Sequence, residues 1–237
     1  MTEASTAGIV SLVPSVTETL LAWGVVPAAC TRFCEQPDLP HVGGTKNPDV
    51  EAIVALRPSL VVMCDEENRR EDADALAAAG VPVHSCSPRS VAEVAPALGD
   101  LADRLLAVGA TPVRSSEPLP SVGPLGVRAF VPIWRRPWMS LAGDTYGSSV
   151  LRAIGVDNVF ADAADRYPEV DLDEARARRS EVVLAPSEPY AFRPAHLAEL
   201  AEVAPVIEVD GQDLFWWGAR TPVAVGRLHR AIAAEVR

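Results

Sequence analysis

Long hydrophobic runs are missing from the 237-residue sequence, and none approaches the roughly 20 apolar residues that a membrane-spanning helix needs. The first eight residues contain no basic segment, no apolar segment and no cysteine that could carry a lipid, so they do not resemble a secretory signal. These absences predict a cytoplasmic protein without a membrane span. An extracytoplasmic location is expected only if a signal peptide has been lost.

Positive charge is scarce as well. The sequence has 21 Lys and Arg residues against 32 Asp and Glu, which gives a formal net charge of −11, and Lys46 is the only lysine. A surface of this sign argues against nucleic acid or an anionic membrane as the main partner. Apolar residues make up 49% of the chain, enough for a substantial core, so global disorder is excluded.

Motifs of the common enzyme classes are also absent. The sequence has no Gly-x-Ser-x-Gly, no phosphate-binding loop, no dinucleotide fingerprint and no His-Glu-x-x-His. The four cysteines include no Cys-x-x-Cys pair, and we expect them to be reduced and buried. Cys34, Cys64 and Cys86 nevertheless follow expected strands, and His84 is nearby. A cysteine-based metal or reactive site therefore stays open as an alternative.

Short β-branched runs alternate with helical patterns through the first 88 residues, which predicts parallel strands with helices on both faces of a sheet. Ser15 and Glu18 have the spacing of a capping box, so the first helix is expected to begin there, with its N–H groups facing the edge where α/β sheets bind ligands. Gly24 and Gly80 stand where helices should end. Strands are expected at 8–13, 28–33, 59–64 and 81–86, and helices at 15–23, 48–56 and 68–79.

A second capping box, Ser90 to Glu93, predicts a helix over 90–108, in which Pro96 should produce a kink. Residues 109–126 hold four prolines and three glycines, a composition typical of a linker. The alternation then returns, with strands at 127–134, 181–185 and 205–209 and helices at 145–154, 172–179, 194–201 and 219–235. The predicted class is α/β, with two lobes that each contain a mostly parallel sheet flanked by helices, bridged by a single long helix. We expect an N-terminal lobe at 1–88, the connecting helix and linker at 89–126, and a C-terminal lobe at 127–237.

Aromatic residues are few, and most of them follow expected strands. Because core aromatics more often lie within strands or on a helix stripe, this placement favours a cleft for a large, flat or apolar ligand. A hydrophobic contact between lobes is the alternative. These aromatic residues are Phe33, Trp134, Trp138, Tyr146, Tyr190, Phe192, Phe215, Trp216 and Trp217.

Charged residues accompany this aromatic set. The neighbouring arginines, whose guanidinium groups suit carboxylate or phosphate and stack on rings, are Arg32, Arg135, Arg136, Arg193 and Arg220. The acidic run at 65–72 has no histidine and precedes a helix. It is interpreted as complementing the helix dipole rather than as a metal site.

Three segments resemble the helical-backbone metal receptor family, the substrate-binding proteins that include cobalamin- and ferric-siderophore-binding components of ABC importers. Residues 11–18 (SLVPSVTE) are similar to the family's opening strand and helix. Residues 42–45 (VGGT) with 53–62 (IVALRPSLVV) are similar to its glycine turn and following helix. Residues 144–151, 155–160 and 167–170 are similar to its second-lobe signature. The cobalamin-binding branch is the most similar.

The resemblance implies two α/β lobes joined by one long helix, with the ligand held between them. Importer members dock on a permease through one glutamate on each lobe, but here the first-lobe region reads Arg69-Arg70-Glu71, which leaves a permease partner in doubt. The residues implied to bind ligand are Pro14, Ser15, Phe33, Glu66, Trp134, Arg135, Trp138, Glu188, Tyr190, Arg193, Trp216 and Trp217.

The sequence therefore predicts a non-enzymatic, monomeric protein that binds a metal chelate, most closely a corrinoid of the cobalamin type, with no covalent cofactor. One alternative is a ferric siderophore or haem binding protein of an ABC importer, favoured by the arginines beside the aromatics. The other is a cytoplasmic metallochaperone or chelate-modifying enzyme that uses Cys34, Cys64, Cys86 or His84.

Overall fold

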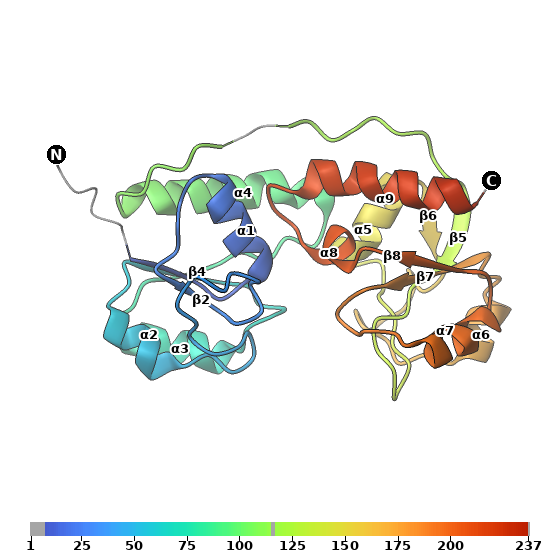
Figure 1. The fold of residues 1–237 in the computed structure, drawn as a ribbon, viewed down its shortest axis with the longest axis horizontal. Coiled ribbons are helices and arrows are strands. Elements are labelled where there is room, and N and C mark those ends of the chain that lie inside the picture. Colours follow the sequence, from blue (N-terminus) through green and yellow to red (C-terminus); the bar gives the residue numbers. More distant parts are fainter. Residues whose placement is uncertain (1–7, 115–116, 237) are drawn as a thin grey trace. The chain divides into compact units, whose positions relative to one another are not determined.

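A computed structural model describes residues 8–114 and 117–236 of the protein (Figure 1). Residues 1–7, on which the expected absence of a secretory signal depends, and residues 115–116 of the expected linker lie outside the described part. The chain forms two compact units, called here the first and the second unit. The first contains residues 8–88, 93–114 and 217–219, and the second contains residues 89–92, 117–216 and 220–236.

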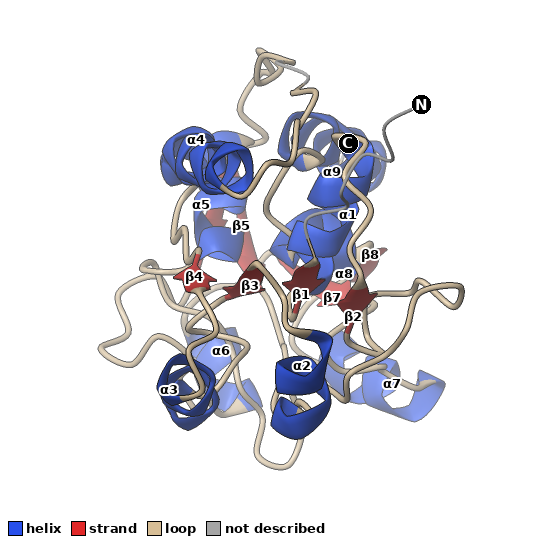
Figure 2. Cartoon of the chain, turned by 90° about the vertical axis from the view of Figure 1, so that its left-hand side faces the viewer, coloured by secondary structure: helices blue, strands red, loops and turns tan. Residues whose placement is uncertain are grey.

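A four-stranded parallel sheet in the order β2-β1-β3-β4 forms the centre of the first unit. On the face of the sheet that α2 and α3 cover, strand side chains form a core with buried residues such as Ile53. These strand residues are Val10, Leu12, Val61 and Met63. Because side chains alternate along a strand, Ile9 and Val62 face the opposite side, where Figure 2 shows helix α1. The elements are β1 (Ile9–Ser11), α1 (Pro14–Ala22), β2 (Ala29–Cys30), α2 (Val50–Leu56), β3 (Leu60–Met63), α3 (Arg70–Ala78), β4 (Val83–Ser85) and α4 (Val91–Ala107).

The second unit repeats this topology with a parallel sheet in the order β6-β5-β7-β8. Helices α6 and α7 cover one face, where Phe130, Phe160, Val183 and Leu200 form a core, and α5, α8 and α9 lie on the other face (Figure 1). The elements are β5 (Val127–Phe130), α5 (Tyr146–Ala153), β6 (Val156–Asn158), α6 (Leu172–Ala177), β7 (Val182–Pro186), α7 (Pro194–Ala201), β8 (Val206–Val209), α8 (Gly211–Phe215) and α9 (Thr221–Glu235). The predicted α/β class with two parallel sheets is confirmed.

Several expected boundaries need correction. Helix α1 begins at Pro14, because a residue in the first helical turn loses nothing by lacking an N–H. Its N-cap residue is Val13, which makes no side-chain hydrogen bond. The predicted capping box of Ser15 and Glu18 is therefore wrong. Strand β5 ends at Phe130 instead of 134. The short elements β6 and α8 were not predicted. Helix α4 continues through Pro96 and ends close to the predicted position. Among the described residues, no helix combines the length and apolarity required to cross a bilayer.

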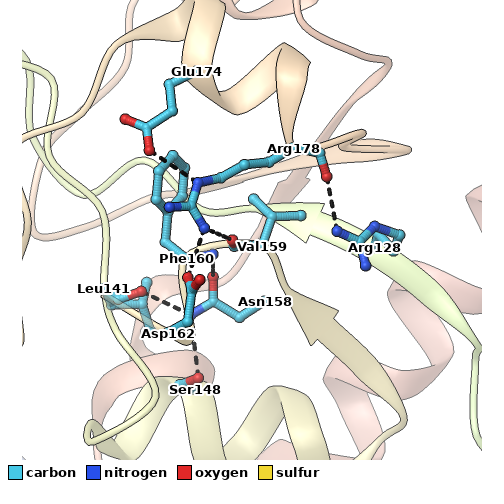
Figure 3. Close-up of polar contacts among 9 residues, drawn as sticks. All are labelled: Arg128, Leu141, Ser148, Asn158, Val159, Phe160, Asp162, Glu174 and Arg178. Atoms are coloured by element: carbon cyan, nitrogen blue, oxygen red, sulfur yellow. Dashed lines mark hydrogen bonds and ion pairs between the residues drawn. The ribbon is translucent and has the colours of Figure 1, made fainter. Parts of the chain in front are cut away.

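Arg178 connects the loop after β6 to helix α6 in the second unit (Figure 3). Its guanidinium donates to the carbonyl of Val159 at 2.9 Å, to Asp162 at 2.6 Å and to Glu174 at 3.0 Å. Arg128 in turn donates to the Arg178 carbonyl at 2.8 Å. The hydrogen bond from Arg178 and the positive charge of its guanidinium lower the pKa of the Asp162 carboxyl from its ordinary value.

A carboxyl group whose pKa is lowered by folding stabilises the protein above its unfolded-state pKa, and this contribution is lost as the pH falls through the folded pKa. We therefore expect Asp162→Asn to lower the melting temperature near pH 7, with a deficit that shrinks as acid protonates the wild-type carboxylate. Thermal unfolding of both proteins across an acidic pH series measures this. A deficit that stays constant down to acid pH would contradict the prediction.

Candidate functional site

Strands β1 and β3 are neighbours in the first sheet, although their connections leave in opposite directions. Ligands of open α/β sheets bind beside the carboxyl ends of such a strand pair. Pro14 and Ser15 are buried at the start of α1, which follows β1, and the Ser15 hydroxyl has no hydrogen-bond partner among the described residues. Phe33, in the loop after β2, keeps half of its surface exposed, with the Arg32 guanidinium 4.8 Å from its ring centre. Glu66 follows β3, and its carbonyl accepts a hydrogen bond from Lys46 at 2.7 Å.

The second unit gathers an aromatic cluster from the loops after β5 and β7, which form the corresponding strand pair of its sheet. Trp134 lies edge-on to Tyr190, with ring centres 5.2 Å apart. Tyr190 is 5.0 Å from Phe192, and Phe192 stacks on Trp138 at 6.0 Å. Trp134 is 45% exposed, which is unusual for a tryptophan inside such a cluster. The cluster thus offers a ring surface at the carboxyl edge of this sheet.

Arg135 belongs to the aromatic cluster but is already engaged. Its guanidinium binds Glu199 through three hydrogen bonds of 2.6 to 3.2 Å and lies 5.5 Å from the Trp138 ring centre. Arg193 is exposed and is the N-cap residue of α7, and its backbone N–H donates to His196 Nδ1 at 3.2 Å. Arg135 therefore orders the cluster, while the guanidinium of Arg193 remains on the surface.

Trp216 and Glu188 form a second polar and aromatic group of the second unit. The Trp216 indole N–H donates to the Glu188 carboxylate at 2.6 Å, and Arg220 lies 5.3 Å from the Trp216 ring centre. Gly211 packs directly on Glu188, because an added Cβ would lie 2.6 Å from its backbone nitrogen. The sequence identified Trp216 and Glu188 separately, but it contained no signal that the two side chains are paired.

Trp217 is 4% exposed and groups with the first unit, so consecutive tryptophans belong to different units. Gly218 adopts a φ of 138° and lies against Thr19, whose hydroxyl accepts the Ala219 N–H at 3.1 Å. Tyr146, another aromatic residue of the predicted set, is also buried, and its hydroxyl lies 3.0 Å from that of Thr221. These two side chains serve local packing in the structure.

The four cysteines are free and buried, and they lie in two separate pairs. Cys34 contacts Cys30 and accepts a hydrogen bond from Thr17 at 3.1 Å, whereas Cys64 is close enough to Cys86 to contribute to the raised pKa of the Cys86 thiol. Burial raises the pKa of Cys30 and Cys86 to about 12 and that of Cys64 to about 11. Burial also lowers the pKa of His84, so its imidazole is neutral at pH 7.

The cysteine and histidine alternative thus loses its structural basis. Across residues 8–114 and 117–236, no group of three or more His, Cys, Asp or Glu side chains has the arrangement of a metal site. Protonated, buried thiols are poor nucleophiles and poor metal ligands.

In the native protein, we expect negligible alkylation of Cys30, Cys64 and Cys86 by iodoacetamide at pH 8, because this pH lies well below their raised thiol pKa values of about 11 and 12. Cys34 should resist alkylation because its side chain is buried. After denaturation without reductant, all four thiols should react, as counted by intact mass. Fewer than four modified thiols would reveal a disulfide, and rapid labelling of the native protein would show that a thiol is accessible.

Comparison with known proteins gives a consistent class. Residues 9–111 match the family described as periplasmic binding protein. The vitamin B12-binding protein of Yersinia pestis (strain Pestoides F) is 27% identical over 194 residues, which cover 74% of this chain and 68% of that protein. The solved periplasmic vitamin B12 binding protein of Vibrio cholerae is 21% identical, with a TM-score of 0.73 over 96% of this chain and 97% of that chain. A periplasmic heme binding protein from Pseudomonas aeruginosa is 20% identical, with a TM-score of 0.76 over 98% and 94% of the two chains.

The two α/β units, each with a parallel sheet, have the fold of these solved binding proteins. Over residues 9–111 the chain is similar to the periplasmic binding protein family. The resemblance inferred from residues 11–18 and 42–62 is therefore confirmed, and the enzyme alternative receives no support from these relatives. The predicted cytoplasmic location receives no support, since these relatives are periplasmic.

Proposed function

We propose that the protein binds a metal chelate of the corrinoid type and presents it to an ABC permease. The observation that carries this proposal is the aromatic cluster of Trp134, Trp138, Tyr190 and Phe192, with a half-exposed Trp134 at the carboxyl ends of β5 and β7. Flat ring surfaces suit the apolar faces of a macrocycle. The relatives named as vitamin B12-binding proteins support the same ligand class.

Both units carry residues that the family resemblance implies to bind ligand. Phe33 supplies an exposed ring from the first unit, and Trp216, held by Glu188, adds a ring with a fixed orientation from the second. The other residues implied by the family resemblance, including Pro14, Ser15 and Glu66, lie at the carboxyl edge of the first sheet, which is the edge where α/β sheets bind ligands. Trp217 and Arg135 are proposed to act by ordering their surroundings.

Haem is the second candidate, and one specific feature favours it. Tyr190 lies within the ring cluster, and a tyrosine oxygen is a known type of haem-iron ligand. Solved heme binding proteins share the fold at TM-scores similar to those of the vitamin B12 binding protein. Coordination of the haem iron by the Tyr190 oxygen would change the Soret band of the haem. A corrinoid has no Soret band and would not show this change.

Titration of the purified protein with cyanocobalamin, haemin and a ferric hydroxamate siderophore, followed by calorimetry and visible absorbance, tests the proposal. We expect saturable binding of one cyanocobalamin per chain and weaker binding of the other two. A haemin complex with a shifted Soret band and no response to cyanocobalamin would favour the second candidate. Absence of binding to all three compounds would overturn the proposed ligand class.

A further inference from the structure

We propose that Asn68 is the positioning residue of the first unit's part of the ligand site, an inference that rests on the proposed function. Its side chain is 5% exposed and lies at the end of the loop that follows β3. The three loops that it connects each carry or support a residue implied to bind ligand.

The side-chain amide of Asn68 forms three hydrogen bonds with the backbone of three separate segments. Its carbonyl oxygen accepts the Cys64 N–H at 2.8 Å, directly after β3. Its NH₂ group donates to the Leu12 carbonyl at 3.2 Å, directly after β1, and to the Thr45 carbonyl at 2.9 Å, in the glycine turn. The partners fix the orientation of the amide, because two carbonyls require the donor group and an N–H requires the acceptor.

Each of these bonds controls a different loop. Leu12 leads into Pro14 and Ser15. Cys64 begins the turn that contains Glu66. Asn68 also closes this turn, because its backbone N–H donates to the Cys64 carbonyl at 2.8 Å. Thr45 follows Gly44, whose backbone packs so closely on Phe33 that an added Cβ would lie 3.0 Å from the ring. Displacing Asn68 would therefore release Phe33 and Glu66 together with the start of α1.

No other side chain of similar size satisfies the same three partners. Aspartate accepts one bond but places a carboxylate against two carbonyl oxygens, leucine makes none of the bonds, and glutamine is one methylene longer. Burial makes each lost bond costly, because the backbone groups left behind have no water to replace it. Local sequence pattern carries no sign of this role, and Asn68 was expected to be the first residue of a helix.

The substitution Asn68→Asp tests the proposal through its pH dependence. At pH 7.5 we expect affinity for cyanocobalamin to fall by about tenfold or more, because the introduced carboxylate repels the Leu12 and Thr45 carbonyls. Burial raises the pKa of such a carboxyl group, so on acidification it takes up a proton before a free aspartate does and can then donate one hydrogen bond. Affinity relative to wild type should therefore recover substantially at pH 5.

Asn158→Asp is the matched control. Asn158 has the same bonding pattern in the second unit, with its NH₂ donating to the Leu141 carbonyl at 2.7 Å and to the Ser148 hydroxyl at 3.2 Å and its oxygen accepting the Phe160 N–H at 3.0 Å (Figure 3). It should lose thermal stability to a similar extent without the loss of affinity. Equal affinity losses in the two variants at equal stability would overturn the positioning role.

Hydrogen exchange separates this inference from the proposed ligand. In Asn68→Asp without ligand, peptides covering residues 12–17, 43–47 and 64–68 should exchange faster together, while those of the second unit keep their protection. If the variant does not fold, Asn68→Ala takes its place and should show the same exchange pattern and weaker binding, with no recovery at pH 5. Unchanged exchange in these three loops would overturn the inference. Wild-type protein that binds none of the probes overturns the proposed function alone.

Discussion

The Trp216→Ala variant is expected to bind cyanocobalamin at least about tenfold more weakly than the wild type, because tryptophan is enriched among the binding-surface residues whose truncation costs about 2 kcal/mol or more. Trp216 is the ring that Glu188 fixes through a 2.6 Å hydrogen bond, with Arg220 on its face. A ring held in this way loses little conformational freedom when ligand binds, so more of its contact energy appears as affinity.

Isothermal titration calorimetry measures this effect without depending on tryptophan fluorescence. Trp216→Phe separates the contribution of the aromatic ring from that of the hydrogen bond to Glu188, because it retains a ring but loses the indole N–H. We expect its affinity to lie between those of wild type and Trp216→Ala. Tyr167→Ala removes an exposed aromatic side chain that has no place in the proposed site and serves as the control. Wild-type affinity in Trp216→Ala would remove this residue from the site.

Replacing Asp213 with asparagine is expected to lower the free energy of unfolding by about 3 kcal/mol. Removing one partner of a buried ion pair costs about 3 to 5 kcal/mol. The Asp213 side chain is 2% exposed and accepts hydrogen bonds from Arg227 through both carboxylate oxygens, one of them from Nε at 2.6 Å. Arg220 Nη2 is a further 3.7 Å contact. This carboxylate thus joins α8 to α9, and its loss deprives two guanidinium groups of their shared counter-charge. Because Arg227 is 43% exposed, water offsets part of the loss and places the effect at the lower end of the range.

Urea unfolding of the Asp213→Asn variant measures this loss. Asp74→Asn is the matched control, because Asp74 forms a 3.9 Å pair with Arg70 in which both side chains are exposed. Such surface pairs contribute about 0 to 1 kcal/mol. A loss below about 1 kcal/mol for Asp213→Asn, indistinguishable from the control, would show that the buried pair is not important for stability.

The pattern of the sequence was sufficient for the fold class. Alternating strand and helix signals predicted both parallel sheets, because crossover connections of this length leave parallel pairing as the available arrangement. Gly24 and Gly80 correctly marked the ends of α1 and α3, where φ values of 74° and 76° are readily adopted only by glycine. The family resemblance likewise depended on local segments, which a single sequence displays directly.

Start positions were less well determined where two local signals compete. At the start of α1, both a proline and a serine with a following glutamate offered an N-terminal signal, and the structure begins the helix at Pro14. The proline has a fixed φ and lacks an N–H that would be unsatisfied at that position in any case. The residue pattern alone gave no means of ranking the two.

The candidate site depended on tertiary structure far more than the fold class did. The sequence by itself determined that aromatic residues follow strands, that positive charge is scarce and that the chain has two α/β halves. Only the tertiary structure decided that Trp134, Tyr190, Phe192 and Trp138 form one cluster, that Glu188 holds Trp216, and that Asn68 joins three loops. The physical reason is that these contacts join residues far apart in the chain. Their geometry is set by sheet order and loop conformation, and neither of these leaves a periodic trace in the sequence.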